Sequence, residues 1–422
     1  MNSKKYDGKL YDIEYVATIK DIVTHTYREH PKRVAYMYKE KGKKSFSGIT
    51  YGELKKKQNA LGTALIEQGF KGANIALIGD NSYEWCLSYF TVVSGVGQIV
   101  PIDKNLKIHE IKNLLERSNA ELIFTDSRHK EDIKGIISDI GSLKNYVLMD
   151  ENGEGDELTI DGLIKSGSRF IKKGMTDYIN AKIDPEQLST ILFTSGTTGL
   201  AKGVMLSHRN LAQNVLSMSK FFKIPEKGRV LSVLPMHHAY EMTCTCITSF
   251  YQGKTVVICQ GLKYIQKDFL EAKCSVMLGV PLIFENMYRK VKTKAEKSGM
   301  KTRLERAIGI SKMLNLRNKP KVAKKMFKSI HNLFGDNLYH FIAGGAAIDP
   351  KVIIEFEAMG IPMMQGYGMT ENAPIIAMNS DRYGKAASAG KALPGTEIRI
   401  VDKDETGIGE IICKGPDRKS VV

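Results

Sequence analysis

Apolar residues in this chain recur with two periods that alternate along the sequence. Residues 15–31 and 50–70 carry apolar side chains at the three- and four-residue spacing of helices, and Gly69 ends the second stretch. Short runs rich in β-branched residues, at 73–80 and 121–126, predict strands between the helices. Strands that alternate with helices are typical of an α/β fold with parallel sheets.

The second half of the chain continues the pattern. We expect a helix at 209–222, and Asn81 is expected to cap an earlier one over 82–97. Asp349-Pro350 marks another helix start, because proline suits the first helical position. Further strands are expected at 254–260 and 274–281, strands that run into glycine-rich bends at 339–350 and 361–371, and a hairpin at 395–416.

Two adjacent histidines, His237 and His238, lie in an apolar run at 230–242. If this run is a strand, neighbouring side chains point to opposite faces, and no carboxylate–histidine spacing accompanies them. The pattern therefore argues against a metal-binding pair. It leaves a structural histidine and a functional histidine as open alternatives.

Length and composition limit the class of protein. A chain of 422 residues exceeds one ordinary core, so we expect subdomains, with one seam near the acidic loop 151–157 and the residues that follow to 185. No run approaches the roughly 18 to 20 apolar residues of a membrane span, and the N-terminus lacks signal-peptide features. The six scattered cysteines predict reduced thiols in a cytoplasmic protein.

Charge is concentrated in one segment. Residues 289–328 hold 15 lysines and arginines against two acids, a net charge of +13 out of +16 for the whole chain. A solvated surface is the favoured interpretation. An amphipathic helix on an anionic membrane is the alternative, and nucleic acid fits less well because aromatic residues are sparse. The helix would place six apolar residues on one face: Val322, Met326, Phe327, Ile330, Leu333 and Phe334.

The clearest chemistry lies between the strand-like runs 188–193 and 204–206. The intervening residues combine three glycines, four hydroxyls and one lysine, Lys202. Glycines let backbone N–H groups face an anion, hydroxyls donate further hydrogen bonds, and lysine adds a positive charge, so the composition suits a phosphate. It is not a Walker A loop, because Lys202 is followed by Gly203. A glycine-rich turn without a ligand is the alternative.

The string TSGTTGLAKGV closely resembles the signature loop of the adenylate-forming (AMP-binding) superfamily, and the chain is similar to its long-chain fatty acyl-CoA synthetases. This implies an α/β fold with two αβαβα-type subdomains and a smaller, distorted β-barrel. It also implies that Lys202 and the loop hydroxyls bind ATP phosphates. The nucleotide-binding residues implied here are Thr194, Ser195, Gly196, Thr197, Thr198, Gly199 and Lys202.

Three further segments resemble later motifs of the same superfamily. LPMHHAYE matches a motif in which His238 lies beside the substrate carboxylate and Glu241 follows. The resemblance places Gly345, Ala346, Gln365, Gly366, Tyr367, Gly368 and Met369 around the nucleotide, Thr370 at the α-phosphate, and Glu371 with Thr194 on Mg²⁺, a cation that prefers oxygen ligands. Further acyl-pocket residues are implied at Gly279, Pro281, Gly344 and Gly368.

Gly368 carries the expectation about substrate size. Members of the superfamily that use short acids have a tryptophan at this place, so a glycine implies room for a long acyl chain. The resemblance thus implies ATP-dependent activation of a medium- or long-chain fatty acid to acyl-AMP and then acyl-CoA, with Mg²⁺ and coenzyme A. A ligase that loads a carrier protein, or a non-catalytic peripheral membrane protein, are the alternatives.

The resemblance covers about residues 10 to 416. The family would continue into a small lid domain with a catalytic lysine, which we do not find, so we expect impaired catalysis. DRKSVV at 417–422 equals the translation of a common sequencing adapter, so we expect a non-native tail.

Overall fold

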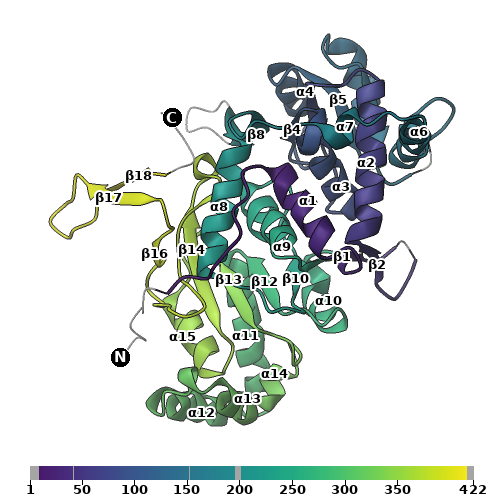
Figure 1. Ribbon diagram of the computed structural model, residues 1–422. Coiled ribbons are helices and arrows are strands. Elements are labelled where there is room, and N and C mark those ends of the chain that lie inside the picture. Colours follow the sequence, from purple (N-terminus) through teal and green to yellow (C-terminus); the bar gives the residue numbers. More distant parts are fainter. Residues whose placement is uncertain (1–8, 41, 152, 195–200, 416–422) are drawn as a thin grey trace. The chain divides into compact units, whose positions relative to one another are not determined.

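The computed structural model describes residues 9–40, 42–151, 153–194 and 201–415 (Figure 1). The chain divides into two compact units, and each is described by itself. Unit 1 comprises Met1–Glu14, Leu216–Leu234 and Lys254–Val422, and unit 2 comprises Tyr15–Val215 and Pro235–Gly253. Residues 151–185, where the sequence suggested a subdomain boundary, lie within unit 2.

Unit 2 contains a mainly parallel sheet in the strand order β7-β6-β5-β3-β4-β8-β9. Only β9 runs antiparallel, as the second strand of a hairpin with β8. The central strands are almost wholly buried, as expected for a sheet with both faces covered. Their bounds are β3 (Asn74–Leu77), β4 (Gln98–Pro101), β5 (Ala120–Thr125), β6 (Asn145–Leu148), β7 (Leu158–Thr159), β8 (Leu188–Thr194) and β9 (Lys202–Ser207).

The helices of unit 2 follow the sequence periodicity. Thr18 and Thr50 cap α1 and α2 in capping boxes. Helix α6 packs tightly on α2, since a Cβ at Gly167 would meet the Ala60 carbonyl oxygen at 1.8 Å. The bounds are α1 (Ile19–Glu29), α2 (Tyr51–Glu67), α3 (Tyr83–Thr91), α4 (Ile108–Arg117), α5 (Lys130–Ile136), α6 (Ile160–Lys172), α7 (Asp177–Asn180) and α9 (Thr248–Tyr251), with the hairpin β1 (Val34–Tyr38)–β2 (Ser47–Thr50). Helix α8 (His208–Phe221) contains the boundary between the units.

The start of α3 differs from the expectation. Its N-cap is Ser82, whose side chain accepts a hydrogen bond from the Trp85 amide, rather than Asn81. Asn81 instead accepts a hydrogen bond from the Met236 amide at 3.0 Å, a contact between distant parts of the sequence. The predicted helix also loses regularity in a π-helical turn, η1 (Val92–Val96), where Gly95 has a φ of 143°.

Unit 1 contains strands in the order β16-β15-β14-β13-β12-β10-β11. The five from β14 to β11 are parallel, and β15 and β16 extend them in antiparallel fashion. The strands predicted within 254–260, 274–281, 339–350 and 361–371 are therefore confirmed, and they pair in parallel as expected. Their bounds are β10 (Arg229–Ser232), β11 (Thr255–Ile258), β12 (Val276–Gly279), β13 (His340–Ala343), β14 (Met363–Gly368), β15 (Ile375–Met378) and β16 (Lys391–Ala392).

The basic segment of unit 1 forms separate helices rather than one amphipathic helix. The chain breaks at Phe327 between α13 (Pro320–Met326) and α14 (Lys328–His331). The single face predicted from the sequence is wrong, because Phe327, Ile330 and Phe334 are buried whereas Val322 and Met326 are exposed. The other helices are α10 (Ile265–Glu271), α11 (Pro281–Lys297), α12 (Lys301–Met313) and α15 (Pro350–Ala358), with 3-10 turns η2 (Ile137–Asp139) in unit 2 and η4 (Leu262–Tyr264) and η5 (Leu316–Asn318) in unit 1.

The end of unit 1 is the predicted hairpin, β17 (Glu397–Val401) with β18 (Glu410–Lys414). Within the described residues the strands form open sheets, and the expected small barrel stays a prediction. All six cysteines are free thiols, as expected. Among the described helices, none combines the length and apolar character that a membrane crossing requires.

Candidate functional site

The phosphate-loop motif joins the two strands of the β8–β9 hairpin. Its central residues, Ser195, Gly196, Thr197, Thr198 and Gly199, lie outside the described residues. Both ends of the loop are described. Thr194 pairs directly with Lys202, which is the first residue of β9 rather than part of the loop. Directly opposed residues on one sheet face have Cβ atoms about 5 Å apart, so the hydroxyl and the ammonium group flank the loop together.

Lys202 is exposed and forms no ion pair with any described residue, so its charge is available to an anion. The sequence did not reveal Arg117, at the end of α4, as a neighbour of this loop. Its guanidinium donates a hydrogen bond of 2.7 Å to the Ala201 carbonyl and lies over the Phe193 ring. Arg117 thereby holds the returning end of the loop against β8.

The two histidines lie in a turn rather than in a strand, which corrects the expectation. Their rings are 4.1 Å apart, and η3 (Tyr240–Ile247), a π-helical segment, follows them. Asn81 anchors this turn through the Met236 amide, beside the carboxyl ends of β3 and β4. The segment therefore belongs to the same edge of the unit 2 sheet as the phosphate loop, the usual place for a ligand in such sheets.

Burial keeps this histidine pair neutral. It lowers the pKa of His237 to about 4, although the Asp103 carboxylate is 3.6 Å from its Nε2 atom. Desolvation also lowers the pKa of His238, whose side chain is nevertheless solvent-exposed and able to meet a substrate. Glu241 is different, since it is fully buried and accepts a hydrogen bond from the Thr245 hydroxyl.

In unit 1 the implied acyl and adenine residues meet at one edge of the sheet. Gly279 ends β12 and pairs with Ala343 of β13, which in turn pairs with Gln365 of β14. The Gly344 amide donates to the Gly279 carbonyl at 3.1 Å. These sequence motifs thus lie on three adjacent strands, β12, β13 and β14, toward their carboxyl ends. Gly345 and Ala346 are exposed there, and the buried Pro281 is the first residue of α11.

Gly368 has a structural explanation that the sequence did not suggest. A Cβ at this position would lie 2.0 Å from the Pro374 carbonyl oxygen, so the β14–β15 hairpin itself demands a glycine. The absence of a side chain at Gly368 therefore does not by itself indicate a long acyl pocket. Tyr367 is exposed and Gly366 and Met369 are half-buried next to it.

Thr370 and Glu371 occupy a 3-10 turn, η6 (Thr370–Asn372), after β14. Glu371 is half-buried and forms no ion pair with a described residue. A carboxylate in this position fits the preference of Mg²⁺ for one or two protein carboxylates. The described residues contain no cluster of three or more metal-binding side chains.

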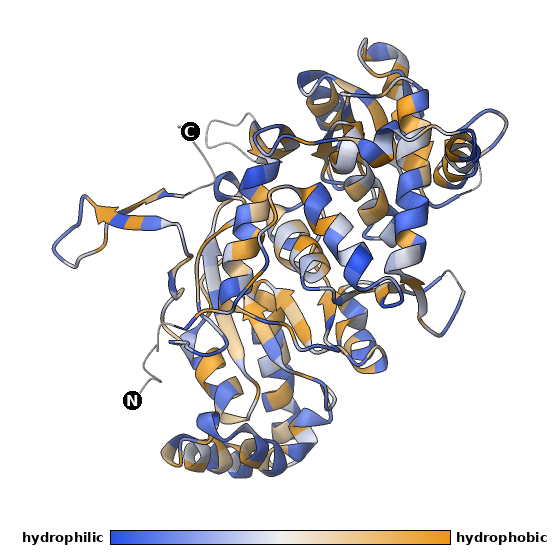
Figure 2. Ribbon diagram, in the orientation of Figure 1, coloured by the Kyte–Doolittle hydropathy of each residue, from blue (hydrophilic) through white to orange (hydrophobic). Residues whose placement is uncertain are grey.

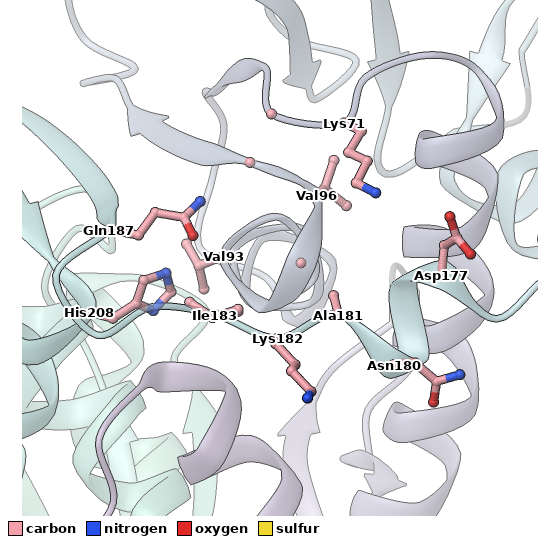
Figure 3. Close-up of a pocket in the computed structure, with 13 residues that line it drawn as sticks. Lys71, Val93, Val96, Asp177, Asn180, Ala181, Lys182, Ile183, Gln187 and His208 are labelled. Atoms are coloured by element: carbon pink, nitrogen blue, oxygen red, sulfur yellow. The ribbon is translucent and has the colours of Figure 1, made fainter.

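A separate cavity of about 500 Å³ lies at the other end of the β8–β9 hairpin, where Gln187 and His208 meet (Figure 3). Lys71 and Lys182 border it, and Val93 and Ile183 give it apolar walls. Because β8 has seven residues, the cavity is about 20 Å from the phosphate loop. It is therefore not part of the candidate nucleotide site.

The chain matches the family of AMP-binding enzymes over residues 23–420. It belongs to that family. This AMP-binding chain is 25% identical to the peroxisomal long chain acyl-CoA synthetase 7 of Arabidopsis thaliana, over 98% of its own length and 62% of the relative's. It is 26% identical to human long-chain-fatty-acid–CoA ligase 1, covering 88% and 57% of the two chains.

A third relative is the chloroplastic long-chain-fatty-acid–[acyl-carrier-protein] ligase AEE15 of Arabidopsis thaliana, 26% identical over 87% of this chain and 58% of the relative. The AMP-binding chain thus spans about three fifths of the relatives it matches. Its fold is that of a long-chain-fatty-acid-CoA ligase from Archaeoglobus fulgidus, with a TM-score of 0.74 and 20% identity over 98% of this chain and 78% of the other.

Proposed function

We propose that this chain carries the ATP- and acid-binding part of a ligase that activates a medium- or long-chain fatty acid and transfers it to coenzyme A. Its membership of the AMP-binding family over residues 23–420 carries the proposal. The two sets of loops at the carboxyl edges of the two sheets support it. The names of relatives that act on long-chain fatty acids support the substrate class.

In the first step a carboxylate oxygen of the fatty acid attacks the α-phosphorus of ATP. The bond from that phosphorus to the bridging oxygen breaks, and pyrophosphate leaves. In the second step the thiolate of coenzyme A attacks the acyl carbonyl carbon and AMP leaves. Such chemistry requires aligned reactants and positive charge near the phosphate oxygens more than a protein nucleophile.

The proposed residue roles are those that the resemblance to the adenylate-forming superfamily implies. Lys202, positioned by the hairpin, neutralises β- and γ-phosphate charge, and Thr370 donates to the α-phosphate. Glu371 and Thr194 are the proposed oxygen ligands of Mg²⁺, which when bound offsets phosphate charge. The neutral, exposed His238 lines the carboxylate end of the acid site, and the glycine edge around Gly345 accepts the adenine.

Binding of an acyl-adenylate analogue tests the proposal on the 422-residue chain. Titration calorimetry would compare palmitoyl-sulfamoyl-adenosine with the acetyl analogue, which differs only in chain length. We expect the palmitoyl analogue to bind at least about a hundredfold more tightly, because an enclosed chain removes many methylenes from water. Equal affinities would refute the fatty-acid assignment, and no binding of either would refute the adenylate site.

A carrier protein as acceptor is the second candidate, and the similarity to an acyl-carrier-protein ligase favours it. It shares the first step and differs only in the thiol that attacks the acyl group. Product formation from preformed palmitoyl-AMP with either coenzyme A or a phosphopantetheinylated carrier protein discriminates between them. Preference for the carrier protein would replace the first candidate.

A further inference from the structure

Two helices of unit 1, α12 and α13, both contact the turn η5. We call their solvent-facing residues, together with Leu314 and Lys328, the α12–α13 surface. It contains none of the residues assigned to nucleotide or acid binding. Apolar and polar positions are mixed along both helices (Figure 2).

The first unusual property of this surface is its exposed apolar side chains. On α12, Met313 is 77% exposed and Ile310 also faces solvent, as does Leu314 directly after the helix. On α13, Val322 and Met326 are exposed one helical turn apart. Isolated exposed apolar residues are common, but here five exposed aliphatic side chains fall within 17 positions, on or next to two helices that contact the same turn. Such a concentration of exposed apolar residues indicates an interaction site.

The second property is unpaired positive charge. Three cations of this region are used inside unit 1, because Lys312, Arg317 and Lys324 form ion pairs with Glu355, Glu357 and Asp336. Other cations are exposed and form no ion pair within the described part of the chain. They are Arg303, Arg306, Lys319, Lys321, Lys325 and Lys328. The paired cations fasten the helices, whereas the unpaired ones remain available to a partner.

We propose that the α12–α13 surface docks on an anionic lipid bilayer. Lysines and arginines are attracted to acidic headgroups, while methionine, leucine and isoleucine side chains insert at the boundary of the acyl chains. A second copy of this chain is the wrong partner, because two segments of charge +13 would repel each other. A nucleic acid would use the cations but leave the aliphatic side chains in water, and Phe327 is buried rather than available for stacking.

This inference goes beyond the proposed enzymatic function and does not depend on it. It concerns binding of the protein to a lipid bilayer, in which fatty acids dissolve. Binding to vesicles can therefore be measured without ATP, coenzyme A or any turnover. A negative result would leave the adenylation proposal intact.

Sedimentation with vesicles tests the surface directly, using the full 422-residue chain. One vesicle type is pure phosphatidylcholine, and in the other about one third of the lipid is phosphatidylglycerol. We expect binding only to the anionic vesicles, with at least about tenfold weaker binding for K321E/K325E. The matched control K55E/K56E reverses two exposed lysines of α2 in unit 2 and should bind like the wild type.

The apolar contribution is tested separately with M313S/L314S. Raising the salt from about 0.1 M to about 1 M should weaken wild-type binding, and the residual binding should vanish in this variant. Full vesicle binding by M313S/L314S would indicate a purely electrostatic polyanion site and would overturn the proposal. Equal binding to both vesicle types, or an equal loss in K55E/K56E, would overturn it as well. Circular dichroism melting would verify that each variant is folded.

Discussion

Unit 1 and unit 2 each contain a sheet of mainly parallel strands, and the carboxyl edges of these sheets present different kinds of atoms. In unit 2 the edge is lined by charged side chains, with Asp126 at the end of β5 and Asp80 after β3. In unit 1 the corresponding edge consists of glycine backbone, at Gly279, Gly344 and Gly366. The first edge depends on ion pairs and hydrogen bonds between side chains, and the second depends on close approach of backbone segments. The unit 2 edge should therefore be sensitive to the removal of a charged side chain, and the unit 1 edge to the addition of a side chain at a glycine.

The largest effect on stability is expected at Gly368 of unit 1, where there is no space for a side chain. Gly368→Ala would place a Cβ 2.0 Å from the Pro374 carbonyl oxygen, and forcing this contact should cost about 3 kcal/mol of unfolding free energy or prevent folding. Urea unfolding measures it. The control is Gly366→Ala, two residues earlier on the same strand, whose Cβ would meet its nearest neighbour at an ordinary 3.4 Å. If both variants were equally stable, the backbone explanation of Gly368 would fail.

The next effect concerns the proposed metal ligand rather than stability. Glu371→Gln keeps the shape of the side chain but removes the charge, so we expect a roughly hundredfold loss of ATP-dependent adenylation. Added Mg²⁺ should partly restore activity, and palmitoyl-sulfamoyl-adenosine should still bind, since it lacks the β- and γ-phosphates. Glu397→Gln, an exposed substitution on β17, is the control and should show neither change. Unchanged magnesium dependence in the Glu371 variant would remove this residue from the metal site.

The charged edge of unit 2 is tested at Asp126. Its carboxylate accepts hydrogen bonds from the Asp80 amide at 2.8 Å and from the His129 ring at 2.6 Å, and both paired side chains are nearly buried. Burial alone would raise the pKa of Asp126, but these hydrogen bonds outweigh it and lower the pKa. The same hydrogen bond raises the pKa of His129. Asp126→Asn should therefore cost about 2 kcal/mol of unfolding free energy near pH 5.5.

The pH dependence of that cost has a defined sign. The stabilisation linked to the raised pKa of His129 is complete below its ordinary value of 6.5 and is lost as the pH rises through the folded-state pKa. The contribution of Asp126 is present above 3.8 and is lost as the pH falls below it. The difference between wild type and Asp126→Asn should thus be larger at about pH 5.5 than at about pH 8.5. The opposite order in urea unfolding would show that the pair is not ionic.

The two edges also differ in how far the sequence predicted them. Glycine motifs such as Gly344-Gly345 indicate a bend where they follow an apolar run, so the bends at the unit 1 edge were predicted from the sequence. The site roles of these glycines stay a prediction. Contacts between distant side chains leave no local pattern. The periodicity could not show that Asn81 would bind Met236 instead of capping α3, because Ser82 offers an equally good cap one residue later. Likewise, the reason for Gly368 lies in Pro374, across a hairpin turn.

The smallest expected effect concerns Arg117, the residue of the phosphate-loop region that the sequence did not reveal. Its hydrogen bond to the Ala201 carbonyl and its contact with Phe193 fix the end of the loop, so Arg117→Ala should raise the KM for ATP about fivefold while leaving kcat within about twofold. Arg117→Lys should recover only part of the loss, because an ammonium group cannot stack as a guanidinium does. Lys112→Ala is the matched control on the same helix. It breaks only an exposed ion pair with Asp139, and exposed pairs contribute little, so the KM should not change. If Lys112→Ala raised the KM as much as Arg117→Ala does, the cause would be a general loss of positive charge on α4. The contact of Arg117 with Ala201 and Phe193 would then have no specific role in ATP binding.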